Sequence, residues 1–143
     1  MSWTNFHTHS LFCDGHAELE EYVQSALDKN MHALGFSGHA PLDFETEWTM
    51  TPRQLEEYTG IIDELKQAYK DKIPLYKGLE VDYIKGLTGP NQYRGQGFDY
   101  LIGSVHVIGQ YEDSTYWSFD HAPEHFTEGF ERIFLNDPRA LSS

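Results

Sequence analysis

Cysteine is nearly absent from this sequence, because Cys13 is the single one among 143 residues. One cysteine cannot form an intrachain disulfide, so no disulfide framework supports the fold. The chain also lacks any run near the roughly 20 apolar residues of a membrane-spanning helix. Its first residues contain neither a basic segment nor a long apolar stretch, so no secretory signal peptide is indicated. We therefore expect a cytoplasmic protein.

Basic residues are scarce as well. Lys and Arg total 10 against 23 Asp and Glu, which gives a formal net charge of -13. Nucleic-acid phosphates and anionic membranes both attract basic patches, so we predict neither as a partner. The acidic excess serves solubility, or some of the carboxylates bind metal cations. The oligomeric state stays open.

Strand-like and helix-like segments alternate along the chain. Apolar runs predict strands, and apolar residues at helical spacing predict helices. The expected strands are residues 3–6, 33–37, 75–81 and 99–105, and the expected helices are residues 17–29, 51–72 and one from residue 123. The stretch 109–120 is ambiguous between a loop and a hairpin. This alternation predicts an α/β fold with a parallel sheet, in a single domain over residues 1–143.

Two helix ends have clear signals. Thr51 can cap the second helix, Pro52 suits its first position, and Gln54 completes a capping box. Asn30 suits the end of the first helix, because asparagine tolerates a left-handed backbone.

Two histidines follow the first expected strand. In extended chain, His7 and His9 point the same way, because residues at i and i+2 share a side. Asp14 can return to the same point if the chain turns at Gly15. Imidazole nitrogens and a carboxylate suit a divalent metal such as Zn, Mn or Fe. Cys13 lies beside them, but we expect it to be a small buried apolar residue.

Further polar residues follow the next strands at the same end of the expected sheet: His39, Glu80, Asp82 and His106. In (β/α) barrels the active site is built at the carboxyl ends of the strands. Glu80 can bridge two cations with its two oxygens. Asp82 alternates to the same side, so it is either a partner that holds a metal ligand or an ordinary polar strand end.

The remaining histidines are expected to be structural or exposed: His16, His32, His121 and His125. The last two lie beside an expected helix start, and one of them could still approach a metal.

The motifs together resemble the polymerase-and-histidinol-phosphatase (PHP) family, and most of all its histidinol-phosphatase branch. They are His7-Thr8-His9 with Asp14-Gly15, Phe36-Ser37-Gly38-His39-Ala40-Pro41, Gly78-Leu79-Glu80-Val81-Asp82 and Phe98-Asp99-Tyr100-Leu101-Ile102-Gly103-Ser104-Val105-His106. The resemblance implies a distorted (β/α)7 TIM-like barrel holding two or three divalent ions (Zn, Mn or Fe). It assigns His7 and His9 to one metal, Glu80 to the bridge, His106 to the second metal, and Asp14 and His39 to the third.

The activity implied by the resemblance is a metal-dependent phosphatase of histidine biosynthesis. It hydrolyses a small phosphorylated substrate, L-histidinol phosphate, to L-histidinol and phosphate. A metal-bound water attacks phosphorus in such sites, and no catalytic side chain is identified. The sequence has neither a P-loop nor a Gly-x-Ser-x-Gly motif, which argues against nucleotide-triphosphate and serine-hydrolase chemistry.

The chain departs from the family pattern in its later part. The family completes its site with a late Asp-x-His motif, and none follows Glu80 here. Four or five strand-helix units do not close a barrel, so we expect a domain truncated at its C-terminus, with an open sheet edge and an uncovered apolar face. Asp137-Pro138 indicates the opening of another helix. Two alternatives stay open: a phosphoesterase acting on nucleotides or DNA ends, and a non-catalytic truncated fragment that binds metal.

Overall fold

The computed structural model describes residues 3–120 and 122–140. Its main sheet has four parallel strands in the order β1-β2-β3-β4. Their bounds are β1 Thr4–Asn5, β2 Ala33–Phe36, β3 Leu75–Asp82 and β4 Tyr100–Ser104. Helix α1 (Leu19–Asp28) connects β1 to β2, and helix α2 (Pro52–Ala68) connects β2 to β3. The predicted parallel α/β sheet is therefore confirmed.

The hydrophobic core lies between the sheet and the two helices. Helix α1 packs on β2, and α2 packs on both β3 and α1. The core contains Val23 of α1, Ile62 of α2, and Leu79 and Val81 of β3, all fully buried. Side chains alternate along a strand, so Glu80 faces the other side of the sheet, away from the helices.

The predicted helix signals are confirmed at both helices. The Thr51 hydroxyl accepts a hydrogen bond from the Gln54 N–H (3.2 Å), and the Gln54 side chain accepts one from the Thr51 N–H (2.8 Å). Asn30 follows α1 with a φ of 52°, in the left-handed region. Helix α2 ends at Ala68, earlier than expected, because the Tyr69 carbonyl accepts hydrogen bonds from Lys72 and Ile73 in a tighter turn.

The face of the sheet opposite the helices has aromatic side chains. Tyr100 lies across this face, and its hydroxyl is 2.8 Å from the Phe6 carbonyl oxygen and 2.9 Å from that of Phe36. A Cβ on Gly78 would lie 2.2 Å from the Tyr100 ring, so a glycine is needed there. The Phe6 ring (39% exposed) lies beside the Tyr100 ring, and the Tyr76 ring (37% exposed) lies beside that of Phe6. The expected uncovered apolar face is thus present.

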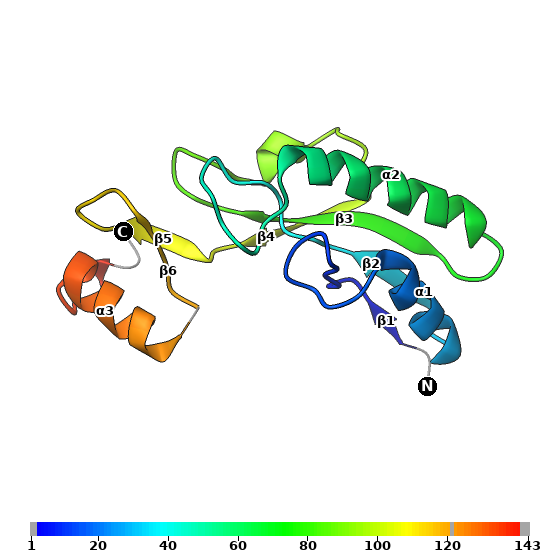
Figure 1. Ribbon diagram of the computed structural model, residues 1–143, viewed down its shortest axis with the longest axis horizontal. Helices are drawn as coiled ribbons and strands as arrows, with labels where there is room; N and C mark the ends of the chain where they lie inside the picture. Colours follow the sequence, from blue (N-terminus) through cyan, green and yellow to red (C-terminus); the bar gives the residue numbers. More distant parts are fainter. Residues whose placement is uncertain (1–2, 121, 141–143) are drawn as a thin grey trace.

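The last part of the chain forms a two-stranded sheet and a helix, separate from the main sheet. Strands β5 (Val107–Gln110) and β6 (Tyr116–Ser118) pair antiparallel, so the ambiguous stretch is a hairpin. Helix α3 (Pro123–Phe134) follows and packs on Trp117, whose indole N–H donates to the His125 carbonyl (3.0 Å). Figure 1 shows this hairpin and α3 at the opposite end of the molecule from α1.

A short 3₁₀ helix, Pro90–Tyr93, lies between β3 and β4. At the expected helix start, the Asp137 side chain accepts a hydrogen bond from the Arg139 N–H (2.9 Å), and the Asp137 carbonyl accepts one from the Ala140 N–H (3.1 Å). These are the bonds of a capped first turn. The rest of that expected helix lies outside the described residues. Within the described ranges, no helix has the length and apolar character needed to span a membrane.

Candidate metal centre

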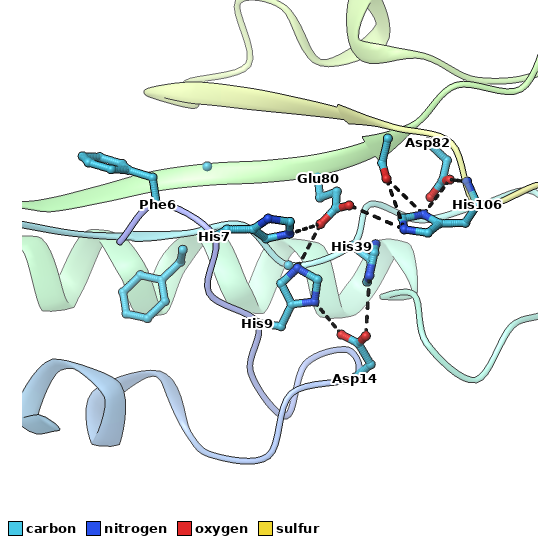
Figure 2. Close-up of polar contacts among 12 residues, drawn as sticks. Phe6, His7, His9, Asp14, His39, Glu80, Asp82 and His106 are labelled. Carbon is cyan, nitrogen blue, oxygen red and sulfur yellow. Dashed lines mark hydrogen bonds and ion pairs between the residues drawn. The ribbon is translucent and has the colours of Figure 1, made fainter. Parts of the chain in front are cut away.

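The histidines after β1 meet a carboxylate near the end of β3. Glu80 Oε2 accepts hydrogen bonds from His7 Nε2 (2.6 Å) and His9 Nε2 (2.9 Å). Figure 2 shows Glu80 between these two rings and His106. Glu80 is only 3% exposed, while the His7 side chain is more than half exposed. A buried carboxylate thus holds two imidazoles at the carboxyl end of the sheet.

A tight turn returns Asp14 to the same point. The Ser10 carbonyl accepts hydrogen bonds from Cys13 and Gly15, and a Cβ on Gly15 would lie 2.3 Å from the Ser10 nitrogen. The turn therefore requires glycine. It brings Asp14 Oδ1 to 2.6 Å from His9 Nδ1, and Asp14 Oδ2 to 3.6 Å from Nε2 of His39.

Asp82 fixes the orientation of the histidine that follows β4. Its Oδ1 accepts hydrogen bonds from both the backbone N–H and Nδ1 of His106, each at 2.9 Å. Asp82 itself is buried, with 2% of its surface exposed. With Nδ1 bound in this way, Nε2 of His106 lies 3.7 Å from Glu80 Oε1. Of the two roles left open for Asp82, this geometry favours the partner that holds a ligand.

The candidate ligands form three overlapping groups: His7, His9 and Glu80; His9, Asp14 and His39; and His39, Asp82 and His106. Within each group the ligand atoms lie within 4.8 Å of one another. The structure therefore brings together every residue proposed from the sequence for the site. Imidazoles with carboxylates are a donor set for divalent transition metals. Nδ1 of His39 is buried and has no hydrogen-bond partner within the described residues.

Hydrogen bonds set the protonation of this cluster. Burial opposes ionisation of Glu80, but hydrogen bonds with His9, Ser104 and His7 lower its pKa to about 2. Burial lowers the pKa of His9, and its hydrogen bonds to Glu80 and Asp14 more than reverse this, so the net shift is upward. Burial lowers the pKa of His39, which keeps its imidazole neutral. Metals bind neutral imidazoles and ionised carboxylates. Glu80 and His39 are therefore in the binding form, whereas a metal ion at His9 competes with the proton that its raised pKa favours.

The groups open into a cleft of about 530 Å³. Four side chains that the sequence reasoning did not select also line it: Glu47, Trp48, Ser118 and Asp120. The Trp48 ring meets the rings of His39 and His106 at centroid distances of 4.8 and 5.3 Å. Glu47 and Trp48 belong to a loop, and Ser118 and Asp120 to the hairpin region. One feature of the sequence could have pointed to these residues: a carboxylate followed by a tryptophan shortly after the His39 motif.

The other residues considered from the sequence lie outside the three groups. Cys13 is half-buried against the hydrophobic core, as expected for a small apolar residue. His16 and His32 are exposed, and His125 lies in α3. None of these four belongs to the metal-ligand groups of the described residues. His121 lies outside the described residues.

Comparison with known proteins agrees with the resemblance. The sequence matches the PHP domain family over residues 5–138. The chain belongs to this family. A Deinococcus radiodurans protein named probable histidinol-phosphatase is 35% identical over 132 residues, which cover 88% of this chain and 48% of that protein. The chain spans about half the length of the curated relatives it matches.

Two solved structures share the fold. One, from Listeria monocytogenes and provisionally assigned as a histidinol phosphatase, is 25% identical with a TM-score of 0.74; the match covers 87% of this PHP chain and 52% of that one. The other is a Lactococcus lactis histidinol phosphate phosphatase in complex with zinc, L-histidinol and phosphate. It is 26% identical with a TM-score of 0.60, over 75% of this chain and 41% of that one. The predicted incomplete barrel of the PHP type is confirmed.

Proposed function

We propose that this PHP chain is the N-terminal portion of a metal-dependent phosphomonoesterase that hydrolyses L-histidinol phosphate to L-histidinol and phosphate. The observation that carries the proposal is the set of three overlapping imidazole-carboxylate groups in one cleft. Related proteins bear the histidinol-phosphatase name, and the Lactococcus structure contains zinc, L-histidinol and phosphate. We also propose that residues 1–143 belong to one domain that acts in the cytoplasm, in histidine biosynthesis.

The proposed cofactors are two or three divalent ions, with zinc the first candidate and manganese and iron accepted by the same donor set. His7 and His9 would hold the first, Glu80 would bridge to the second on His106, and Asp14 and His39 would hold a third. Bound cations supply Lewis-acid chemistry, since they neutralise phosphate charge and acidify water.

The residues of the chain itself prepare the cleft for this chemistry. Glu80 is ionised, since its pKa lies at about 2. Asp82 turns Nε2 of His106 toward Glu80 by binding Nδ1 and the backbone N–H. His39 is held neutral by burial. A bound phosphate would thus meet side chains that already have the required orientation, which lowers the entropic cost of ordering them during the reaction.

The composition of the cleft supports a small substrate over nucleic acid. No Lys or Arg is among the described residues that line it, and the chain carries a net charge of -13. Long phosphate backbones need basic contacts along their length, whereas a single phosphate group can be held by cations alone.

The test measures zinc binding by calorimetry and phosphate release from L-histidinol phosphate with added zinc or manganese. His9→Ala removes a residue shared by two ligand groups and should weaken zinc binding at least tenfold. His32→Ala is the matched control, because His32 is an exposed histidine outside the groups.

The two readouts separate the parts of the proposal. Equal zinc affinity in wild type and His9→Ala would overturn the metal centre. Zinc binding without phosphate release above the His9→Ala background would overturn catalysis by the 143-residue chain and favour the metal-binding fragment. Release from DNA ends in place of L-histidinol phosphate would overturn the substrate.

A further inference from the structure

The hydrogen-bond ladder between β2 and β3 is altered at one position, directly before two candidate ligands. The register of the two strands continues past the end of β2 to an isolated parallel bridge between His39 and Glu80. At that bridge the Ala40 N–H donates to the Glu80 carbonyl (2.8 Å). The bonds of a parallel pair are evenly spaced, so the same register would join the Gly38 N–H to the Gly78 carbonyl.

A tyrosine hydroxyl from α2 stands at this position instead. The Tyr58 hydroxyl accepts a hydrogen bond from the Gly38 N–H (3.1 Å) and donates one to the Gly78 carbonyl (2.9 Å). Two hydrogen bonds in series thus replace one direct bond, and they hold the amide and the carbonyl farther apart than a direct bond would. Because Gly38 directly precedes His39 and Gly78 lies two residues before Glu80, this separation is set beside both candidate ligands.

The Tyr58 side chain belongs to the hydrophobic core and not to the described residues that line the cleft. It is fully buried, and burial raises the pKa of Tyr58, so the hydroxyl keeps the proton that it donates to Gly78. A Cβ on Gly38 would lie 3.2 Å from a Met50 side-chain atom and 3.5 Å from the Tyr58 ring, so the backbone here is closely surrounded. The packing of α2 on the sheet (Figure 1) therefore fixes the position of the hydroxyl.

We propose that Tyr58 is a positioning residue of the candidate metal centre, because its hydroxyl, inserted between β2 and β3, sets the separation of His39 and Glu80. Tyr58 touches neither a metal ion nor the substrate, and it acts through the backbone of Gly38 and Gly78. This role rests on the proposed function, since the separation of the two side chains matters only where they bind metal. The spacing of the ligands is thus set from the helix side of the sheet, behind the cleft.

The experiment compares Tyr58→Phe with Tyr69→Phe by zinc calorimetry and by urea denaturation of the metal-free chain. Tyr69 is the matched control, because it is another buried tyrosine, and its hydroxyl bonds the α1 side chains of Glu20 (2.7 Å) and Gln24. Both substitutions should lower the urea midpoint, since each leaves polar partners without a hydroxyl. Only Tyr58→Phe should weaken zinc binding, by about tenfold, the lower end of the range for groups that orient metal ligands.

Cobalt absorption gives a readout that a loss of stability alone would not change. The visible bands of bound Co²⁺ depend on the geometry of its ligands. The bands of cobalt-loaded Tyr58→Phe should therefore differ from those of wild type, while those of Tyr69→Phe should match them. A lower urea midpoint in Tyr58→Phe with unchanged zinc affinity and an unchanged cobalt spectrum would show a structural role only, and would overturn the proposed positioning role.

A measurement on wild type decides the matter even where Tyr58→Phe does not fold. Coupling between two sites is reciprocal, so zinc should shift the NMR resonances of the Tyr58 ring and leave those of Tyr69 unchanged. Unshifted Tyr58 resonances in the zinc-loaded chain would overturn the positioning role while the metal centre stands. No zinc binding by wild type would overturn the metal centre itself and the role of Tyr58 with it.

Discussion

Tyr100 joins the ends of the two strands that lead to the candidate ligands. Its hydroxyl lies 2.8 Å from the Phe6 carbonyl oxygen and 2.9 Å from that of Phe36. Phe6 directly precedes His7, and Phe36 lies three residues before His39. A single side chain on β4 thus ties β1 and β2 together on the face of the sheet opposite the helices. Tyr100→Phe removes this tie and leaves the aromatic ring in place.

The expected cost follows from the hydrogen bonds alone, because no cavity is formed. One hydroxyl hydrogen serves two carbonyl oxygens, so the variant loses the equivalent of one hydrogen bond. It also leaves the part-buried Phe36 carbonyl without this donor. We expect the free energy of unfolding to fall by about 1–2 kcal/mol. Since the strand ends are then less fixed, zinc affinity should fall about 3- to 10-fold.

Urea denaturation of the metal-free protein and zinc titration by calorimetry measure the two effects. Tyr76→Phe is the matched control: Tyr76 lies on the same face, and its hydroxyl makes no hydrogen bond within the described residues. It should change neither quantity measurably. An unchanged zinc affinity in Tyr100→Phe, or an equal loss in both variants, would refute the reasoning that the hydroxyl positions the strand ends.

Three further substitutions test packing and charge in the sheet and in helix α2. Gly78→Ala should destabilise the fold by about 1–3 kcal/mol in urea denaturation, because its Cβ would lie 2.2–2.5 Å from Tyr100 ring atoms; an unchanged midpoint would contradict this. Gly60→Ala in α2 should stabilise it by about 0.5–1 kcal/mol, since nothing lies within 4 Å of the added Cβ, and a loss of stability would contradict that expectation. Burial opposes ionisation of Asp99, but hydrogen bonds from Lys66 and the Lys77 N–H lower its pKa below the ordinary 3.8. The ionised Asp99 carboxylate therefore stabilises the fold above pH 3.8, and this stabilisation is lost as the pH falls through the folded-state pKa. The difference in unfolding free energy between wild type and Asp99→Asn should shrink in acid. A constant difference across the pH series would contradict this role of Asp99.

The features that sequence reasoning predicted are those with a local cause. The capping box at Thr51 and Gln54 depends on residues three apart, and the strands depend on short apolar runs. Once the strands are parallel, their carboxyl ends meet at one edge. His7, Glu80 and His106 therefore came together although many residues separate them in the chain.

The features that could not be predicted from the sequence depend on contacts between residues far apart in the chain. From the sequence, Tyr100 was predicted only as a residue of a strand, because the two carbonyl oxygens that its hydroxyl contacts belong to distant parts of the chain. The Trp48 side chain reaches the site only because its loop folds back over the end of the sheet. The residues 109–120 stayed ambiguous between loop and hairpin, since their pairing is set by packing of Trp117 on α3, with its indole N–H bound to the His125 carbonyl.

The cleft therefore has two sides with different physical origins. The candidate ligands follow strands whose backbones are hydrogen-bonded and whose helix-facing side is packed in the core, which holds groups such as Glu80 and Asp82 rigidly. Glu47 and Trp48 lie in a surface loop, which tolerates change more readily than the sheet beneath it. Replacing a sheet residue such as Asp82 should weaken metal binding itself, because His106 then loses the group that orients it.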